Sequence, residues 1–476
     1  MKKLFIFLIS SLLIFSCEDS LVEEPKSLAV ETFYNTAEEV ESAINAIYSP
    51  LRSSNNMGAL FPAQQEAMAD YCYGRGSYAV VSEYTGLNST NITRVGQMWD
   101  LYYQAIRNAN IVIANVPNGT ELTDDEKAAY IGEARFLRAL TYFIMVRNWD
   151  AIPLRTIENM TEADIPKSSA SEIYELIVED LSYAENNLPE SVSIAGKPSK
   201  WAAKSILADV YLNLEEYALS SSKALEVMQS GAYSLVPVSE ADDFLNIYGP
   251  SIINSTEEVF YFKYNSVDGF FFVMFAHHPG SGYHGAGGYY AHYTFADNPV
   301  IENWDETDLR KEYNLYYYDF GLGDTYLFKK FIDPSAPTNA GASNDYPLYK
   351  YSDVLLIYAE ATAMSNGGPN AEALEALNMI HRRAYGYDAL TASPVDLTST
   401  GMSAEEFRDM VLKEKMYETI YEGKRWMDMK RINKAEEIIS EIKGIDMNEK
   451  MLLWPLPNSE MNYNKALSAS DQNPGY

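Results

Sequence analysis

The chain holds only two cysteines, and the first of them, Cys17, closes an N-terminal stretch with the pattern of an export signal. Lys2 and Lys3 precede an apolar run from Leu4 to Phe15 that is broken only by two serines. This run is too short to span a bilayer, so residues 1–16 are predicted to be a cleaved signal peptide. Ser16-Cys17 resembles a bacterial lipobox, which makes Cys17 the predicted lipidation site. The alternative is an ordinary signal peptide with an incidental cysteine.

Lipidation of Cys17 would leave the second cysteine, Cys72, without a partner in its own chain. An exported protein without a disulfide must draw its stability from a hydrophobic core. Residues 17–476 are long enough to bury a large core, and we expect them to form a single domain. The acyl chains would hold this domain on the membrane rather than through it.

The charge of the chain is strongly acidic. Its 36 Lys and Arg against 67 Asp and Glu give a net charge of −31, and loss of Lys2 and Lys3 with the signal would make it −33. Such a surface repels phosphate backbones and anionic headgroups. We therefore expect no nucleic-acid partner, and contact with the membrane through the lipid anchor only.

Helix starts are marked by a repeated pattern in which a Ser or Thr is followed three residues later by Glu. In a capping box of this kind the hydroxyl and the carboxylate each satisfy a free backbone N–H. The pattern occurs at Thr36 and Glu39, Thr123 and Glu126, Ser169 and Glu172, and Ser403 and Glu406. A further helix is expected from Asp100 to Val116, ending before Pro117-Asn118-Gly119.

Two stretches, 201–224 and 353–383, have the spacing of small and aromatic residues that is typical of tetratricopeptide-like helix pairs. Unrelated amphipathic helices are the alternative. The fold is therefore predicted to be mostly α, with helical parts at about 24–231 and 347–476. Between them, residues 232–346 lose helical periodicity and are rich in Tyr, Phe, Gly, Asn and Asp, which predicts long loops with a few short strands. Loops of that length are usually functional.

Several segments, in this order and spacing, resemble the SusD/RagB family of surface glycan-binding lipoproteins. They are Phe33-Tyr34-Asn35-Thr36, Ala134-Arg135-Phe136-Leu137-Arg138-Ala139, 202–212, 351–361, Glu422-Gly423-Lys424-Arg425-Trp426, 427–431, Trp454-Pro455-Leu456-Pro457 and the final Gln472-Asn473-Pro474-Gly475-Tyr476. Two local departures are Asp150-Ala151, where a glycine is usual, and Lys465, where a proline is common.

The resemblance implies a scaffold of about four tetratricopeptide-like helix pairs that carries an elaborated loop region. It also implies a glycan ligand and a partner, a SusC-like TonB-dependent barrel in the outer membrane of a Gram-negative bacterium. Glu18 and Asp19 resemble the tag that directs such lipoproteins to the cell surface. The charged family residues themselves look structural: Glu422, Arg425, Asp428 and Arg431 have the i, i+3 spacing of ion pairs on one helix, and Arg135 and Arg138 have the same explanation.

The ligand site is predicted where two loop systems could meet, Tyr71 to Tyr84 and Gly280 to Tyr293. Tyrosines offer flat apolar surface to the C–H faces of sugars, and glycines between them let the rings protrude. The stacking candidates are Tyr283, Tyr289 and Tyr290, opposed by Tyr73 and Tyr78, with Arg75 and His284 binding hydroxyls at the rim. The alternative for any one tyrosine is packing within the loops or contact with the barrel.

Other chemistries find less support in the sequence. Four of the five histidines lie between 277 and 292, but without metal-ligand spacing, so we expect no metal and no cofactor. No carboxylate pair or nucleophile motif stands out, so we expect no catalytic residues. Two other functions stay open: a tetratricopeptide-like scaffold for peptide or protein nutrients, and a secreted glycoside hydrolase.

Overall fold

A computed structural model describes residues 33–476. The predicted signal peptide, Cys17, Glu18 and Asp19 lie outside the described residues. Across residues 33–476 no helix combines the length and apolar character needed to cross a bilayer.

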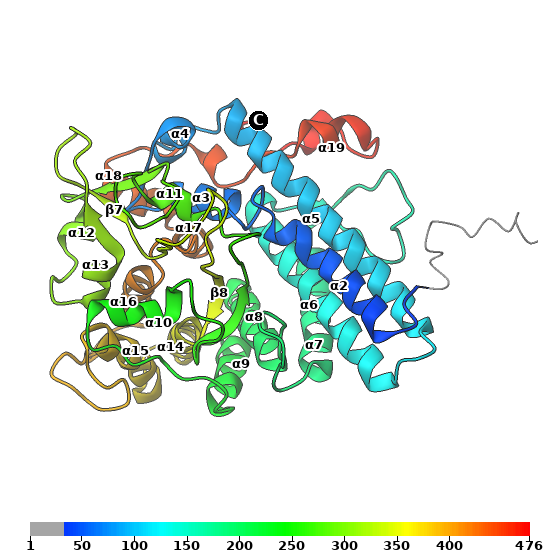
Figure 1. Cartoon of the computed structure of the whole chain (residues 1–476), viewed down its shortest axis with the longest axis horizontal. Coiled ribbons are helices and arrows are strands. Elements are labelled where there is room, and N and C mark those ends of the chain that lie inside the picture. The colour runs from blue at the N-terminus through cyan, green and yellow to red at the C-terminus, as the bar shows by residue number, and fades with distance from the viewer. Residues whose placement is uncertain (1–32) are drawn as a thin grey trace, which may run out of the picture.

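A series of eight helices forms the scaffold, each packed against the next (Figure 1). In chain order they are α2 (Ala37–Arg52), α5 (Ser89–Asn115), α6 (Asp124–Trp149), α7 (Ala170–Asn187), α8 (Lys200–Asn213), α9 (Tyr217–Gln229), α14 (Tyr351–Asn366) and α15 (Ala371–Ala384). They read as four successive pairs, α2/α5, α6/α7, α8/α9 and α14/α15, with α9 passing directly to α14 across the loop-rich insertion. The mostly α, tetratricopeptide-like fold is thus confirmed.

The helix starts that were predicted from capping boxes are confirmed. All four predicted boxes form, with the hydroxyls of Thr36, Thr123, Ser169 and Ser403 accepting from the backbone N–H three residues on. The expected start at Asp100 was wrong, because α5 begins at Ser89. Asn88 caps it by accepting from the Asn91 N–H at 3.0 Å, and burial of the face carrying Val95 and Trp99 outweighs the weak helix propensity of the first turn.

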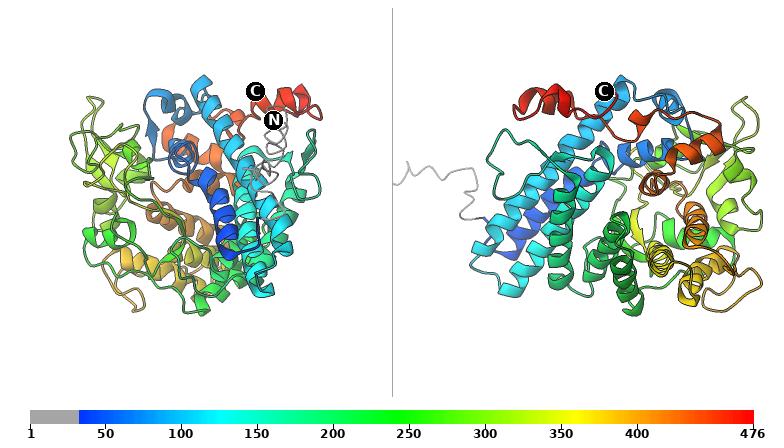
Figure 2. Two further views of the ribbon diagram at one scale, coloured as in Figure 1. Left: turned by 45° about the vertical axis from the view of Figure 1, so that its right-hand side comes forward. Right: turned by 180° about the vertical axis from the view of Figure 1, so that it is seen from behind.

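Residues 232–346 form only short elements. They are η5 (Ala241–Phe244), α10 (Leu245–Tyr248), β4 (Glu258–Phe262), α11 (Val273–Ala276), β5 (His292–Phe295), α12 (Pro299–Glu302), α13 (Leu309–Asn314), β6 (Leu315–Tyr317) and β7 (Thr325–Phe328). The three views place this region on the side of the molecule away from α5, α6 and α7 (Figure 2). Strand β4 leaves the insertion to pair with β8 (Tyr346–Lys350), which runs directly into α14.

The other α-helices and β-strands belong to neither the eight-helix series nor the insertion. They are α3 (Leu60–Ala67), β1 (Tyr73–Gly74), α4 (Ala79–Ser82), the pair β2 (Ile152–Pro153) and β3 (Lys167–Ser168), α16 (Ala404–Glu418), α17 (Arg425–Arg431), α18 (Ala435–Lys443) and α19 (Asn458–Tyr463). Trp149 and Trp454 meet edge to face in the core, 4.9 Å apart, so the family segment near the C-terminus packs on the end of α6.

The prediction of one charged helix face at 422–431 was partly wrong. Asp428 and Arg431 do pair along α17, at 3.0 Å. Glu422, however, precedes this helix and binds two lysines from other segments, while Arg425 pairs with Asp70 at 2.6 Å. Glu422 and Asp428 are buried, and Arg425 and Arg431 are half-buried.

Asp150 has a strained backbone. It ends α6 at φ 63° and ψ −119°, a conformation that a Cβ atom disfavours, and its side chain is exposed. We expect Asp150→Gly to raise the free energy of unfolding by about 1 kcal/mol in urea titration. Asp150→Ala is the matched control, since it removes the carboxylate and keeps Cβ. Equal or lower stability of the glycine variant would contradict this account.

Candidate functional site

A four-stranded sheet brings three distant loop segments together. Its order is β1-β5-β7-β6, and every neighbouring pair is antiparallel. Tyr73 of β1 lies opposite Tyr293 of β5, and the Arg75 N–H donates to the Ala291 carbonyl at 2.7 Å. The two loop systems singled out in the sequence therefore do meet. The β6–β7 hairpin adds a third segment beside them.

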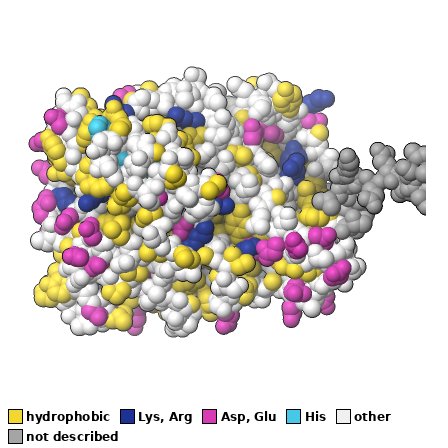
Figure 3. All heavy atoms as spheres, viewed as in Figure 1, with side chains coloured by type: hydrophobic (Ala, Val, Ile, Leu, Met, Phe, Trp, Pro, Cys, Tyr) yellow, Lys and Arg dark blue, Asp and Glu magenta, His cyan; other side chains and the backbone are white. Residues whose placement is uncertain are grey.

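Four rings cluster at the surface of this sheet. We call His278, Tyr290, Tyr318 and Phe320 the aromatic platform. Tyr290 and Phe320 are near-parallel at 5.8 Å, Tyr318 and Phe320 meet edge to face at 4.9 Å, and His278 lies 4.2 Å from Tyr318. All four residues are partly exposed. In the space-filling view, hydrophobic side chains with histidines among them gather over the part of the molecule that holds β7 and α11 (Figure 3).

A single cation lies over the platform. The Arg75 guanidinium carbon is 3.9 Å from the centre of the Tyr290 ring and 5.0 Å from that of Phe320. One guanidinium N–H also donates to the Tyr290 carbonyl at 3.1 Å. The platform thus offers apolar ring surface and fixed hydrogen-bond donors side by side, which suits a ligand with both kinds of surface.

The backbone that carries Tyr290 is held by a close crossing. The N–H groups of Tyr290 and Ala291 donate to the carbonyls of His277 and Phe275 at 3.0 and 2.8 Å. At Gly288 a Cβ would lie 1.8 Å from the His277 carbonyl oxygen, so only glycine fits there. Tyr290 itself has φ 36°, an unusual value for a residue with a side chain. Strain of this kind is often retained where a side chain must point in a fixed direction.

Of the seven predicted ligand residues, the structure places Tyr290 and Arg75 at the platform. Tyr73 packs behind it, against Tyr293 and Phe295. Tyr283 is half-buried, against His277 and Tyr316. Tyr289 is exposed but turns the other way, toward Phe271 and Phe275. Adjacent tyrosines therefore serve different surfaces. Ligand contact by Tyr73, Tyr283 and Tyr289 stays a prediction.

Two predicted positions were wrong. Tyr78 was expected to oppose the stacking rings, but it is 2% exposed, with Arg94 over its face at 4.4 Å and Phe275 at its edge. His284 was expected at the rim, but it is 3% exposed, and its Nδ1 accepts from the Ala286 N–H at 3.1 Å. Tyr78 turns inward because the turn at 76–78 packs on α5, and His284 because its backbone pairs with Asp333.

Sequence reasoning missed three of the four platform rings: His278, Tyr318 and Phe320. A signal for two of them was present in the run Tyr316-Tyr317-Tyr318-Asp319-Phe320, just before Gly321. Alternate residues of an extended strand share a face, so Tyr316, Tyr318 and Phe320 point together while Tyr317 points away. Tyr317 indeed packs on Tyr326 of the neighbouring strand and is 56% exposed.

Comparison with known proteins identifies the family of this chain. A model described as the SusD family matches residues 287–476, and one described as "Starch-binding associating with outer membrane" matches residues 21–212. SusD-like protein P38 of Formosa agariphila is 27% identical over 95% of both chains. The chain belongs to the SusD/RagB family.

Solved SusD-like structures share the whole fold. A SusD homologue from Bacteroides thetaiotaomicron superposes with a TM-score of 0.80 at 21% identity, covering 94% of this chain and 98% of that one. A laminarin-binding SusD-like protein superposes with a TM-score of 0.74 at 21% identity, covering 93% and 100%. At these identities the likeness is one of fold.

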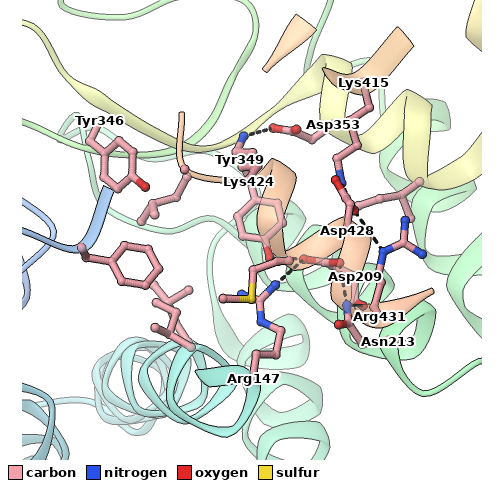
Figure 4. A pocket seen from close by; sticks show the side chains of 17 residues that line it. Arg147, Asp209, Asn213, Tyr346, Tyr349, Asp353, Lys415, Lys424, Asp428 and Arg431 are labelled. Carbon is pink, nitrogen blue, oxygen red and sulfur yellow. Dashed lines mark hydrogen bonds and ion pairs between the residues drawn. The ribbon is translucent and has the colours of Figure 1, made fainter. Parts of the chain in front are cut away.

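The segments that carry the SusD/RagB resemblance line a hollow between the helix series and α17 (Figure 4). Its charged side chains bind one another: Lys424 pairs with Asp353 at 2.7 Å, Lys415 with Asp428 at 2.9 Å, and the Tyr349 hydroxyl donates to Asp209 at 2.7 Å. Because these side chains bind one another, the family residues here stabilise the scaffold. The hollow is a structural feature of this SusD-family chain and does not overlap the platform.

Buried histidines sit beneath the platform. Burial, partly offset by the hydrogen bond that His277 Nε2 donates to the Phe331 carbonyl at 2.7 Å, lowers the pKa of His277 to about 4. Burial likewise lowers the pKa of His292 to about 3. Both are therefore neutral at pH 7. Within residues 33–476, no three or more His, Cys, Asp or Glu side chains are grouped so that they could hold a metal ion.

These pKa shifts predict acid sensitivity. Below pH 6.5 the unfolded chain binds a proton on each histidine and the folded chain does not, so stability falls as the pH drops toward the folded values. Between pH 7 and pH 5 each should cost about 2 kcal/mol of unfolding free energy.

His277→Gln keeps an N–H donor for Phe331 but removes the titration. Its unfolding free energy, from urea titrations at each pH, should therefore fall about 2 kcal/mol less than that of the wild type over this interval. Parallel pH profiles for the two proteins would contradict the burial of a neutral His277.

Proposed function

We propose that this protein is a cell-surface glycan-binding lipoprotein that captures oligo- or polysaccharide and delivers it to a SusC-like TonB-dependent transporter. The observation that carries the proposal is the aromatic platform, with its partly exposed rings and the Arg75 guanidinium above Tyr290. Sugars present apolar C–H faces and polar rims, and this surface pairs ring faces with hydrogen-bond donors.

Family membership supports the glycan as ligand. One matching family model is described as starch-binding and associated with the outer membrane, and one structure of the same fold is a laminarin-binding protein. Delivery to a barrel and surface display are part of the proposal, because the resemblance to this family implies them. The predicted lipid anchor at Cys17 would tether the domain where such a barrel opens.

Binding without hydrolysis fits the chemistry of the platform. A glycosidase places two carboxyl groups on either side of the scissile bond. The platform residues and Arg75 supply imidazole, phenol and guanidinium groups instead. A glycan bound there should be released unchanged, as chromatography of the supernatant after long incubation would establish.

Loss of a platform ring should weaken binding. Tyr290→Ala and Phe320→Ala should each raise Kd several-fold, since a stacking ring contributes about 1 kcal/mol beyond area effects. The measurement is calorimetry with the best-binding polysaccharide of a panel, after melting curves have shown that each variant is folded. An open site of this kind suggests a Kd on the order of 1 mM to 1 μM.

Two tyrosines provide matched controls for those variants. Tyr463→Ala removes a ring that is 83% exposed at the end of α19, far along the chain from the platform, and should leave Kd unchanged. Tyr289→Ala tests whether the neighbouring ring, which faces Phe271, takes part. If Tyr290→Ala binds like Tyr463→Ala, the ligand site lies elsewhere.

Lipidation is expected at Cys17. Metabolic labelling with a fatty-acid analogue should mark the wild type and not Cys17→Ala. The other cysteine, Cys72, is free and fully buried, so reductant should leave the melting temperature of the lipid-free domain unchanged. Equal labelling of both proteins would exclude the anchor.

A further inference from the structure

We propose that the ligand of this platform is an acidic glycan, whose carboxylate or sulfate group is bound by Arg75; this rests on the proposed glycan-binding function. The argument starts from how Arg75 is held. Its backbone is tied to Ala291, and its guanidinium lies over the Tyr290 and Phe320 rings and donates to the Tyr290 carbonyl. The charge therefore has a defined position before any ligand arrives, which lowers the entropic cost of binding.

Most donors of the Arg75 guanidinium remain available. One N–H is taken by the Tyr290 carbonyl. The others make no hydrogen bond within residues 33–476, and none of those nitrogen atoms is buried without a partner, so they reach solvent. A planar guanidinium with free donors matches the geometry of carboxylate and sulfate oxygens.

The absence of an acidic partner for Arg75 is unusual in this molecule. The chain has 67 acids, and ten of its fourteen arginines form ion pairs within the described part of the chain. The four arginines without a carboxylate within 4.0 Å are Arg75, Arg94, Arg107 and Arg155. Arg155 instead donates to the carbonyls of Glu162 and Ala163, and Arg107 is exposed on α5.

The two others are Arg75, over the platform, and Arg94, which is hydrogen-bonded to Ser77 of the same loop. Arg94 donates to the Ser77 hydroxyl at 2.8 Å and lies over the Tyr78 ring, so both arginines border the segment 75–78. Neither acid of the hairpin pairs with Arg75: Asp319 accepts from the Gly321 N–H, and Asp324 from the Tyr317 hydroxyl. Two arginines without a carboxylate partner at the segment 75–78 favour an anionic ligand over a neutral one.

A purely structural role for Arg75 predicts something different. If the guanidinium served only to support Tyr290, its loss would weaken neutral and acidic glycans alike. A charge-assisted bond to the ligand, in contrast, would be lost for acidic glycans alone and would be screened by salt.

The test compares two pairs of polymers that differ in charge. Polygalacturonate and its methyl ester examine carboxylates, and carrageenan and unsulfated agarose examine sulfates. Affinity electrophoresis and calorimetry on the intact soluble domain should show preference for the charged member of at least one pair, weakening as NaCl rises. Arg75→Gln should reduce that binding about tenfold or more and leave binding of the neutral member within about twofold.

Matched variants separate charge from folding. Arg107→Gln removes the same charge from an exposed site and should bind like the wild type. Arg75→Lys keeps the charge without the planar fork, so it should retain salt-dependent but weaker binding even if Arg75→Gln fails to fold.

The outcomes are distinct. Equal or better binding of the neutral members overturns the acidic ligand and leaves the glycan-binding function standing. An equal effect of Arg75→Gln on both members also overturns it. Absence of binding to all four polymers and to laminarin overturns both proposals.

Discussion

One buried carboxylate joins the insertion, strand β8 and the segment before α17. Glu422, in the turn before α17, accepts hydrogen bonds from Lys330 after β7 at 2.8 Å and from Lys350 at the end of β8 at 2.6 Å. Burial alone would raise the pKa of Glu422, but the ammonium groups of Lys330, Lys350 and Lys424 more than offset it and hold that pKa below its usual range. Burial also lowers the pKa of Lys330 to about 8. Loss of Glu422 would leave the buried ammonium groups of Lys330 and Lys350 without this carboxylate partner, which typically costs several kcal/mol.

Buried ion pairs also join α15 and α16 to the insertion. Arg383 bridges Glu257, just before β4, and Glu418, at the end of α16, both at 2.6 Å. Arg310 of α13 binds Glu414 at 2.6 Å. The insertion is thus fixed to the helical scaffold by charges that have few alternative partners once water is excluded. Apolar packing of equal size could give similar stability, but it would specify position less strictly. All four platform residues belong to the insertion, so these ion pairs also fix the position of the platform.

Features that depend on neighbouring residues could be predicted from the sequence, whereas features that depend on distant contacts could not. A capping box is complete within four residues, so Thr36 and Ser403 could be assigned from the sequence alone. The direction of a tyrosine in a glycine-rich loop depends on backbone angles and on what packs behind it. Tyr290 and Tyr78 look alike in the sequence, yet one lies at the surface and the other is buried. The partners of Glu422 lie 72 and 92 residues away, beyond any periodicity.

The number of residues in the β6–β7 hairpin decides which of its rings face the aromatic platform. Tyr318 and Phe320 reach the platform just beyond the end of β6, where the Tyr318 N–H still donates to the Thr325 carbonyl, while Tyr317 of β6 faces the opposite side. Insertion or deletion of a single residue before Tyr318 would exchange the two faces and remove both rings while altering no aromatic residue. A change of two residues would keep the faces and shift only the reach of the hairpin. Chains of this type that differ in ligand preference should therefore differ in this hairpin by even numbers of residues.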